Sequence, residues 1–296
     1  MNIYILFLLF LFNIFSLYAF EKEKCYRVND IQNFIDHHSQ KTQKDDLVLV
    51  QLTIDKVNID IYIPKLDQKK CTKNLLVLPG WKFSKTRWFN ETRLIEFIKK
   101  YQYIAIAPEM NITVYESQYF PETKLKWHKK PGMQFIENDF IPYFNKFNLF
   151  KEVYYNMGLG LSTGARGIIL ITSRNPKLFY SVAALSGDYD QTITPTDNLM
   201  RLTYGEYHQF KERWHTIDNP IHNFQQKGIH THIYLGHGKK DNIVSYEHTL
   251  HLYNFLKNRN PSKTVLLNLC ENCKHDFPYW DKELDAVFTF FEQTIN

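Results

Sequence analysis

The segment Gly-Leu-Ser-Thr-Gly at positions 160–164 decides the fold of this chain. An apolar run at 153–159 predicts a strand before it, and the pattern after it predicts a helix over 163–173. A serine with glycines two positions to either side, set between a strand and a helix, is typical of a nucleophile elbow. Glycines are needed because side chains would collide in so tight a turn. The context favours Ser162 as a nucleophile over the alternative, a glycine-rich turn with a surface serine.

Short apolar strands alternate with helices on both sides of the elbow. Strands are predicted at 47–54 and 57–63, which form an antiparallel hairpin, and at 75–78, 103–107, 153–159, 180–185, 231–235 and 264–269. Helices are predicted at 91–101, 134–147 with a bend at Pro142, 163–173, 246–256 and 282–294. This alternation implies an α/β fold with a mostly parallel central sheet and helices on both faces. Only 189–230 interrupts it, and we expect a small cap-like insertion there, within one domain that spans 20–296.

A serine hydroxyl needs a base to take its proton, and the base needs an acid to orient it. His275 is the only histidine after the last predicted strand, in a loop that can reach back to the elbow. Asp241 follows the penultimate strand, and in triads built on such an elbow the acid precedes the histidine in the chain. Asp188 and Asp190, after an earlier strand, are the competing acids. We expect a triad of Ser162, Asp241 and His275.

When a serine attacks a carbonyl carbon, the carbonyl oxygen becomes an oxyanion, which needs two backbone N–H donors. One comes from the residue after the nucleophile, Thr163, and the other from the loop after the strand at 75–78. In that loop Gly80 allows the backbone to turn and Trp81 supplies the N–H. We therefore expect Trp81 and Thr163 to form the oxyanion hole.

Three aromatic residues follow the strand at 103–107 and are candidates for a substrate groove. Tyr115, Tyr119 and Phe120 lie in the segment 114–123, at the same edge of the predicted sheet as the nucleophile. Ordinary packing of this loop is an equally good interpretation.

At these residues the chain resembles the α/β-hydrolase superfamily, and within it the putative-esterase family that includes esterase D and S-formylglutathione hydrolase. The segment 162–167, Ser-Thr-Gly-Ala-Arg-Gly, is similar to the family's Ser-x-Gly-Gly-x-Gly. The likeness extends loosely from position 47 to the C-terminus. Ala165 replaces the second glycine of that pattern, and Pro79 stands where a histidine usually precedes Gly80. The resemblance implies an α/β-hydrolase fold and carboxylester hydrolysis without a cofactor, and the two departures leave the substrate open.

The amino-terminal residues predict the compartment. Positions 3–20 are almost wholly apolar, interrupted only by Asn13 and Ser16. We interpret 1–19 as a signal peptide cleaved after Ala19, which makes the protein secreted or periplasmic. The alternative is an uncleaved segment that anchors the chain in a membrane. No Lys or Arg precedes the run, which weakens both interpretations.

The four cysteines are consistent with export, because an even number in an exported chain suggests disulfides. We prefer the local pair Cys270–Cys273, which leaves Cys25–Cys71. A metal site formed by Cys270, Cys273 and His275 is the alternative. Zinc usually takes four ligands, and the chain has no second Cys-x-x-Cys to complete such a site.

The charge balance excludes an obvious nucleic-acid role. Lys and Arg number 36 and Asp and Glu 31, which gives a net charge of +5 with no block of like charges. The expected partner is a small-molecule ester, and no stable membrane association is expected unless the N-terminal segment is retained. A peptidase or acyltransferase of the same fold is one alternative, and a non-catalytic binding protein that kept the fold is another. The complete triad speaks against the latter.

Overall fold

The computed structural model describes residues 25–26, 28–44, 46–152 and 154–295, which form a nine-stranded sheet. The strands are β1 Lys41–Lys44, β2 Leu47–Ile54, β3 Val57–Pro64, β4 Lys73–Leu78, β5 Tyr103–Pro108, β6 Asn156–Leu161, β7 Ser181–Leu185, β8 His232–Gly238 and β9 Val265–Cys270. Their order across the sheet is β1-β2-β3-β5-β4-β6-β7-β8-β9. Neighbouring strands pair antiparallel from β1 through β2 and β3 to β5. The remaining neighbours, in the order β5, β4, β6, β7, β8 and β9, pair parallel. The predicted α/β-hydrolase-type sheet is confirmed.

Helices cover both faces of the central strands. Every residue of β4, β6 and β7 is buried, which explains why the apolar residues of these strands are consecutive rather than alternating. The outer strand β2 is different, since its burial varies along its length and it lies near the sheet edge. The elbow after β6 therefore stands at the middle of a rigid sheet.

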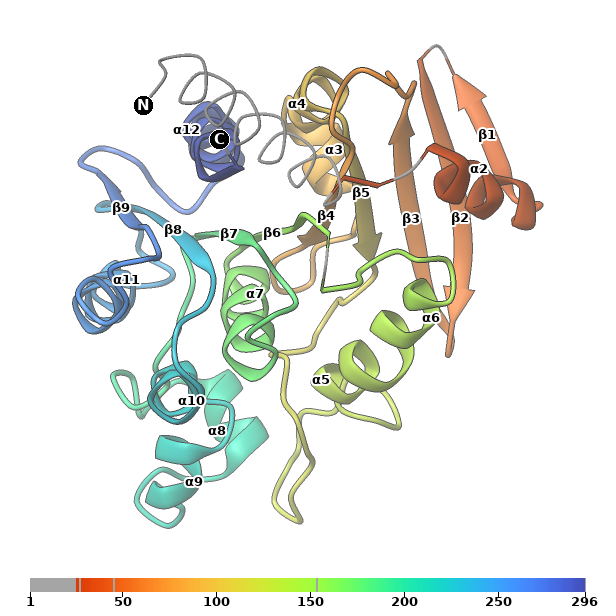
Figure 1. The fold of residues 1–296 in the computed structure, drawn as a ribbon. Coiled ribbons are helices and arrows are strands. Elements are labelled where there is room, and N and C mark those ends of the chain that lie inside the picture. Colours follow the sequence, from red (N-terminus) through yellow and green to blue (C-terminus); the bar gives the residue numbers. More distant parts are fainter. Residues whose placement is uncertain (1–24, 27, 45, 153, 296) are drawn as a thin grey trace, which may run out of the picture.

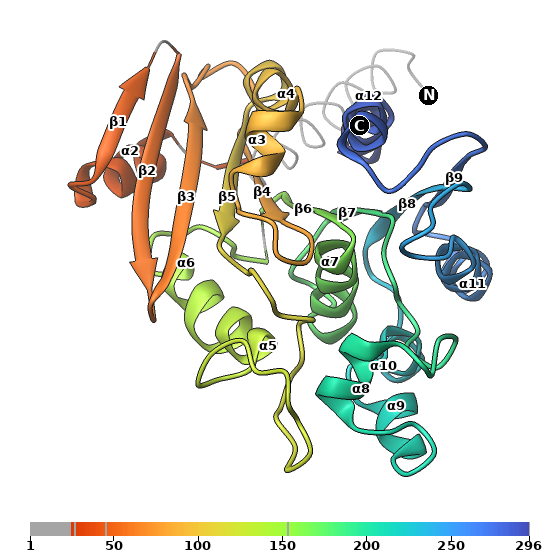
Figure 2. The same cartoon turned by 180° about the vertical axis from the view of Figure 1, so that it is seen from behind.

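Two layers of helices enclose the sheet (Figures 1 and 2). One layer contains α3 Arg87–Glu91, α4 Leu94–Tyr101 and α12 Phe277–Ile295. The other contains α2 Val28–His37, α5 Gly132–Phe135, α6 Ile141–Asn145, α7 Thr163–Arg174, α10 Pro220–Lys227 and α11 Glu247–Leu256. Each layer buries its own apolar cluster against one sheet face. The elbow helix α7 packs within the second layer through its buried residues.

The insertion predicted at 189–230 contains α8 Asn198–Tyr204, α9 Lys211–Thr216 and α10. Figure 1 shows α8 and α9 at the edge of the molecule, away from the sheet. In contrast, α10 packs on α7, where Asn223 Nδ2 donates a hydrogen bond to Ser173 Oγ at 3.2 Å. Only the part that contains α8 and α9 is thus cap-like, and α10 belongs to the helical layer.

Two helix predictions need correction. The helix expected at 134–147 is divided, with a π-helical turn at Ile136–Phe140 between α5 and α6. Pro142 has no N–H for an α-helical bond, and the wider turn directly precedes it. The last helix begins at Phe277 rather than 282, because the Asp276 carboxylate accepts a hydrogen bond from the Tyr279 N–H at 3.2 Å and caps the first turn.

The predicted disulfide pairing is confirmed. Cys25 bonds to Cys71 and Cys270 to Cys273, with Cα–Cα distances of 5.2 and 5.4 Å. All four cysteines are thus paired with one another. Among the residues described, no helix combines the length and apolar character of a membrane span. The predicted signal peptide at 1–19 lies outside the described residues.

A buried histidine on α11 makes stability depend on pH. His248 is 2% exposed, and burial lowers its pKa to about 4. In the unfolded chain a histidine titrates near 6.5, so between these values the unfolded state binds more protons and stability falls as the pH drops. We expect His248→Leu to reduce the loss of stability between pH 7 and pH 4 by about 3 kcal/mol. Denaturant unfolding at both pH values measures this, with the exposed His208→Leu as control, and equal losses in wild type and His248→Leu would contradict it.

Candidate active site

The backbone at Ser162 is strained, as the flanking glycines Gly160 and Gly164 predict. Ser162 has φ +55° and ψ −126°, and its N–H donates a hydrogen bond to the Leu185 carbonyl of β7 at 2.8 Å. A Cβ on Gly160 would lie 2.3 Å from the Gly164 carbonyl oxygen, and one on Gly164 would lie 2.5 Å from the Leu78 carbonyl oxygen. Both glycines are therefore sterically required, and the turn presents the serine at the carboxyl ends of the strands.

Three side chains far apart in the sequence lie in a row at this edge. Ser162 Oγ is 3.0 Å from His275 Nε2, and His275 Nδ1 is 2.6 Å from Asp241 Oδ2. The carboxylate only accepts, so Nδ1 carries a hydrogen and Nε2 is left to accept the serine proton. All three are largely sheltered from water, with Ser162 7% exposed and the side chains of His275 and Asp241 8% and 0%.

The environment of Asp241 keeps its carboxylate charged. Burial alone would raise the pKa of Asp241, but hydrogen bonds from His237, His275 and the Val244 N–H outweigh burial and lower it. Its Oδ1 accepts hydrogen bonds from the backbone N–H groups of Ile243 and Val244 at 2.9 and 2.8 Å. The acid is thus ionised wherever the protein is folded at ordinary pH.

His237, near the end of β8, is a residue that the site analysis from sequence missed. Its Nε2 lies 3.2 Å from Asp241 Oδ2, the same oxygen that faces His275. The four-residue spacing between His237 and Asp241, at the end of a strand, was the available signal.

The two backbone groups expected to bind an oxyanion lie beside the serine. A Cβ on Gly80 would lie 3.2 Å from Ser162 Cβ, so the loop that carries Trp81 packs directly on the elbow. Thr163 is the first residue of α7, where a backbone N–H has no acceptor within the helix. The Trp81 N–H likewise has no hydrogen-bond acceptor in the described part of the chain. Both donors are available to a ligand.

The aromatic candidates after β5 have separate surroundings. Tyr115 is 0% exposed, and its ring fills the space beside Gly167 of α7, so it packs the interior and has no surface for a substrate. The Tyr119 hydroxyl donates to the carbonyls of His128 and Lys130 within its own loop. Tyr119 and Phe120 are both partly exposed and stay candidates.

Phe120 and Trp81 belong to one apolar cluster that reaches the insertion. Both pack against a buried set formed by Val114, Met200, Tyr204 and Trp214. Met200 and Tyr204 lie on α8 and Trp214 lies on α9. The cap-like helices therefore extend to the loop that carries Trp81.

The competing acids do not contact the histidine. Asp190 Oδ1 accepts hydrogen bonds from Thr192 Oγ1 at 2.7 Å and Asn219 Nδ2 at 3.0 Å. Asp188 Oδ1 is buried and has no hydrogen-bond partner in the described part of the chain. Burial raises the pKa of Asp188 to about 6, although the Arg166 charge opposes this. Of the three carboxylates, the structure brings only Asp241 to His275.

The disulfide Cys270–Cys273 lies against the segment that carries Asp241. The carbonyls of Cys270 and Cys273 accept hydrogen bonds from the N–H groups of Lys239 and Lys240 at 2.8 and 3.0 Å. A Cβ on Gly238 would lie 2.4 Å from the Cys273 carbonyl oxygen, so the two segments are in close contact. This short ring thus supports both the acid and the loop that leads to the histidine.

The two disulfides are expected to contribute differently to activity and to stability. Removing Cys270–Cys273 by double serine substitution should lower kcat about tenfold, because the loops that carry His275 and Asp241 lose their brace. It should destabilise the fold by about 2 kcal/mol, since it closes a very short ring. Removing Cys25–Cys71, which closes a 46-residue separation, should cost about 4 kcal/mol with little change in kcat. Kinetics and denaturant unfolding of both variants measure this, and the reverse ordering would contradict it.

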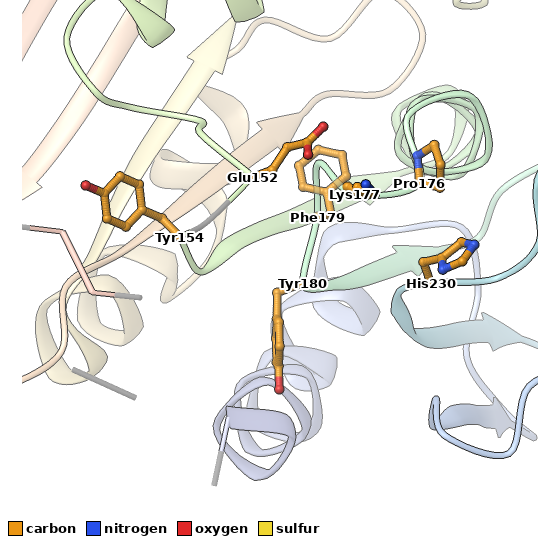
Figure 3. Close-up of a pocket in the computed structure, with 7 residues that line it drawn as sticks. All are labelled: Glu152, Tyr154, Pro176, Lys177, Phe179, Tyr180 and His230. Atoms are coloured by element: carbon orange, nitrogen blue, oxygen red, sulfur yellow. The ribbon is translucent and has the colours of Figure 1, made fainter. Parts of the chain in front are cut away.

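A hollow of about 340 Å³ lies at the opposite edge of the sheet (Figure 3). Its lining includes Glu152 before β6, Lys177 and Phe179 before β7, and His230 before β8. Ser162, Asp241 and His275 instead follow the carboxyl ends of parallel strands, so this hollow is separate from the row that they form.

Comparison with known proteins supports the fold. A model of the prolyl oligopeptidase family matches residues 156–296, slightly less than half of the chain. An S-formylglutathione hydrolase from Agrobacterium tumefaciens superposes with a TM-score of 0.66 at 10% identity, covering 87% of this chain and 99% of that chain. One from Staphylococcus aureus gives 0.62 at 15%, covering 84% and 98%. Est1E from Butyrivibrio proteoclasticus gives 0.59 at 15%, covering 83% and 98%. No curated protein matches the chain.

These findings confirm the predicted fold class. The chain has the α/β-hydrolase fold, with a mostly parallel sheet, helices on both faces and an elbow serine after β6. The identities are low, so the likeness extends to the fold and not to a shared substrate.

Proposed function

We propose that the protein is a secreted or periplasmic serine hydrolase that cleaves carboxylic esters through an acyl-enzyme. The observation that carries this proposal is the row of hydrogen bonds from Ser162 Oγ to His275 Nε2 and from His275 Nδ1 to Asp241 Oδ2. The two disulfides support export, and the solved structures of similar fold named as S-formylglutathione hydrolases support ester or thioester chemistry.

The reaction proceeds in two halves. Ser162 Oγ attacks the ester carbonyl carbon while its proton passes to His275 Nε2, and the N–H groups of Trp81 and Thr163 bind the oxyanion. The bond to the alkoxy oxygen then breaks as His275 returns the proton to the leaving alcohol. Water attacks the acyl-enzyme with the same base, which releases the acid and regenerates the serine. Asp241 orients His275 and stabilises its charged form throughout.

Hydrolysis of short-chain p-nitrophenyl esters tests this proposal most directly. The purified protein should release p-nitrophenol and should be labelled covalently by a fluorophosphonate probe. Absence of both reactions in the folded, oxidised protein would overturn the proposal and favour a binding protein that kept the fold.

A peptidase is the second candidate, because the family model that matches residues 156–296 is that of prolyl oligopeptidases. The same triad can attack an amide, which needs better stabilisation of the leaving amine. A panel of peptide p-nitroanilides beside the esters separates the two candidates. A kcat/KM for an anilide that exceeds that for matched esters would favour the peptidase.

A further inference from the structure

His237 is a buried residue of β8 that the mechanism above does not yet use. It is 0% exposed. Its Nε2 lies 3.2 Å from Asp241 Oδ2 and 3.0 Å from the Val244 carbonyl oxygen. Its Nδ1 lies 2.6 Å from Thr249 Oγ1 on α11. Every polar atom of the ring therefore has a partner, and one partner is the acid of the triad.

These partners determine where the ring carries its hydrogen. A carboxylate and a carbonyl oxygen only accept, so Nε2, which faces both, must carry a hydrogen. In the neutral ring Nδ1 then has a lone pair, and the Thr249 hydroxyl donates to it. The chain of donors runs from Thr249 through His237 to Asp241, and from there the carboxylate accepts from His275.

Each oxygen of the Asp241 carboxylate already has two hydrogen-bond donors. Oδ1 accepts the N–H groups of Ile243 and Val244, and Oδ2 accepts His237 and His275. The backbone bonds fix one oxygen, but only side chains reach the other. Of the two side chains on Oδ2, His275 also exchanges a proton with Ser162 through its Nε2, whereas His237 takes no part in proton transfer.

We propose that His237 is a positioning residue, whose Nε2–H holds Oδ2 of Asp241 in line with His275 Nδ1 and shares the negative charge of the carboxylate. This inference rests on the proposed function. Without that hydrogen bond only His275 holds Oδ2, so the carboxylate can tilt about the fixed Oδ1, and a misplacement of about 1 Å in such a group can cost about 100-fold in rate. Its undivided charge would also attract a proton on the His275 ring more strongly.

Few other charged groups act on this pair. From α11 His248 interacts electrostatically with His237, and from α12 Tyr279 interacts with Asp241. Lys239, next to Gly238 of β8, is half-buried and pairs with Glu271 at 2.6 Å. Neither Lys239 nor His248 has a hydrogen bond to Asp241 or His275 among the described residues. Asp188 is electrostatically coupled to His275, and burial raises its pKa to about 6, so its charge also contributes to the acid limb, in wild type and His237 variants alike.

The test compares two substitutions of His237 over a range of pH. His237→Leu removes the donor, and His237→Gln places an amide N–H near the former Nε2. We expect His237→Leu to lower kcat about 10- to 100-fold with little change in KM, and to move the acid limb of kcat/KM to higher pH by about half a unit or more. His237→Gln should restore most of kcat and the wild-type limb. A folded His237→Leu protein with an unmoved limb, or a His237→Gln protein as impaired as His237→Leu, would overturn the proposal.

His248→Leu is the matched control, because it removes another buried histidine from the neighbouring helix without touching Asp241. It should leave the acid limb in place. Nitrogen NMR of ¹⁵N-histidine wild-type protein gives a second test that needs no active variant, with His237 identified by its loss in His237→Gln. A hydrogen on Nε2 is expected, and an Nε2 without hydrogen would overturn the proposal. Failure of the proposed function is distinct, since the wild-type protein itself would then be inactive on esters.

Discussion

Replacement of Ser162 by alanine is expected to lower kcat for ester hydrolysis by about 10⁶-fold in a protein that stays folded. The substitution removes only the oxygen that bonds to the acyl group, so His275 has no hydroxyl to activate. The Cβ remains, and with it the steric environment of the φ +55° elbow. The lost hydrogen bond to His275 should cost about 1 kcal/mol of stability, which separates loss of catalysis from loss of fold.

Ser186→Ala is the matched control for this experiment. Ser186 also directly follows a central strand, is 0% exposed and has φ +56°, and its Oγ accepts a hydrogen bond from Trp280 Nε1 at 3.1 Å. Its substitution should cost less than about tenfold in kcat, and it should leave fluorophosphonate labelling intact. The decisive measurements are turnover, labelling and circular dichroism on both proteins. Near-normal turnover by folded Ser162→Ala would remove Ser162 from the mechanism.

The parts of the fold that the sequence predicts are those governed by local patterns. The central strands β4, β6 and β7 are buried on both faces, so they appear as apolar runs that end at turn residues. The elbow is predicted by glycines whose Cβ atoms would overlap backbone, a requirement that depends on the turn itself. These features need no knowledge of distant contacts.

The amino-terminal elements α2 and β1 were not predicted, because their structure depends on contacts with distant parts of the chain. Strand β1 has the sequence Lys-Thr-Gln-Lys, which lacks the alternating apolar pattern of a strand, and it is ordered by pairing with β2 at the sheet edge. Helix α2 has only two buried residues, Ile31 and Phe34, at a helical spacing of three. Tyr26 beside it donates a hydrogen bond to Asn156 of β6, 130 positions away. No local pattern contains that contact.

The site itself divides in the same way. Predicting residue types at strand ends needs only chain order, but choosing among Asp188, Asp190 and Asp241 requires side-chain directions that the sequence does not contain. His237 was missed because a buried histidine on a strand has the same pattern whether it packs or donates to an acid. Tyr115 was a candidate for a groove because a loop residue is expected at the surface, whereas its ring fills the space left by Gly167.

Asp241→Asn is expected to lower kcat by about 10⁴-fold, the precedent for loss of the acid in a serine protease triad. The asparagine amide either donates to His275 Nδ1, which forces the hydrogen to Nε2 and removes the base, or offers an uncharged oxygen that does not stabilise the imidazolium. The backbone N–H groups of Ile243 and Val244 can still bond to the amide oxygen, so the loop is expected to stay folded. KM should change little, because the carboxylate is 0% exposed and cannot touch a substrate.

Asp188→Asn is the comparison that separates the effect of a nearby charge on His275 from the effect of a hydrogen bond to it. Both aspartates are electrostatically coupled to His275, but only Asp241 bonds to it, at 2.6 Å. If charge alone mattered, both substitutions would reduce kcat by similar factors. If the hydrogen bond that fixes the tautomer matters, Asp188→Asn should cost less than about tenfold at pH 8. Because the pKa of Asp188 is raised to about 6, its charge opposes folding above that pH, so the asparagine variant should be at least as stable as wild type at pH 8. A larger loss of kcat in Asp188→Asn than in Asp241→Asn would assign the acid to Asp188 and leave Ser162 and His275 in their roles.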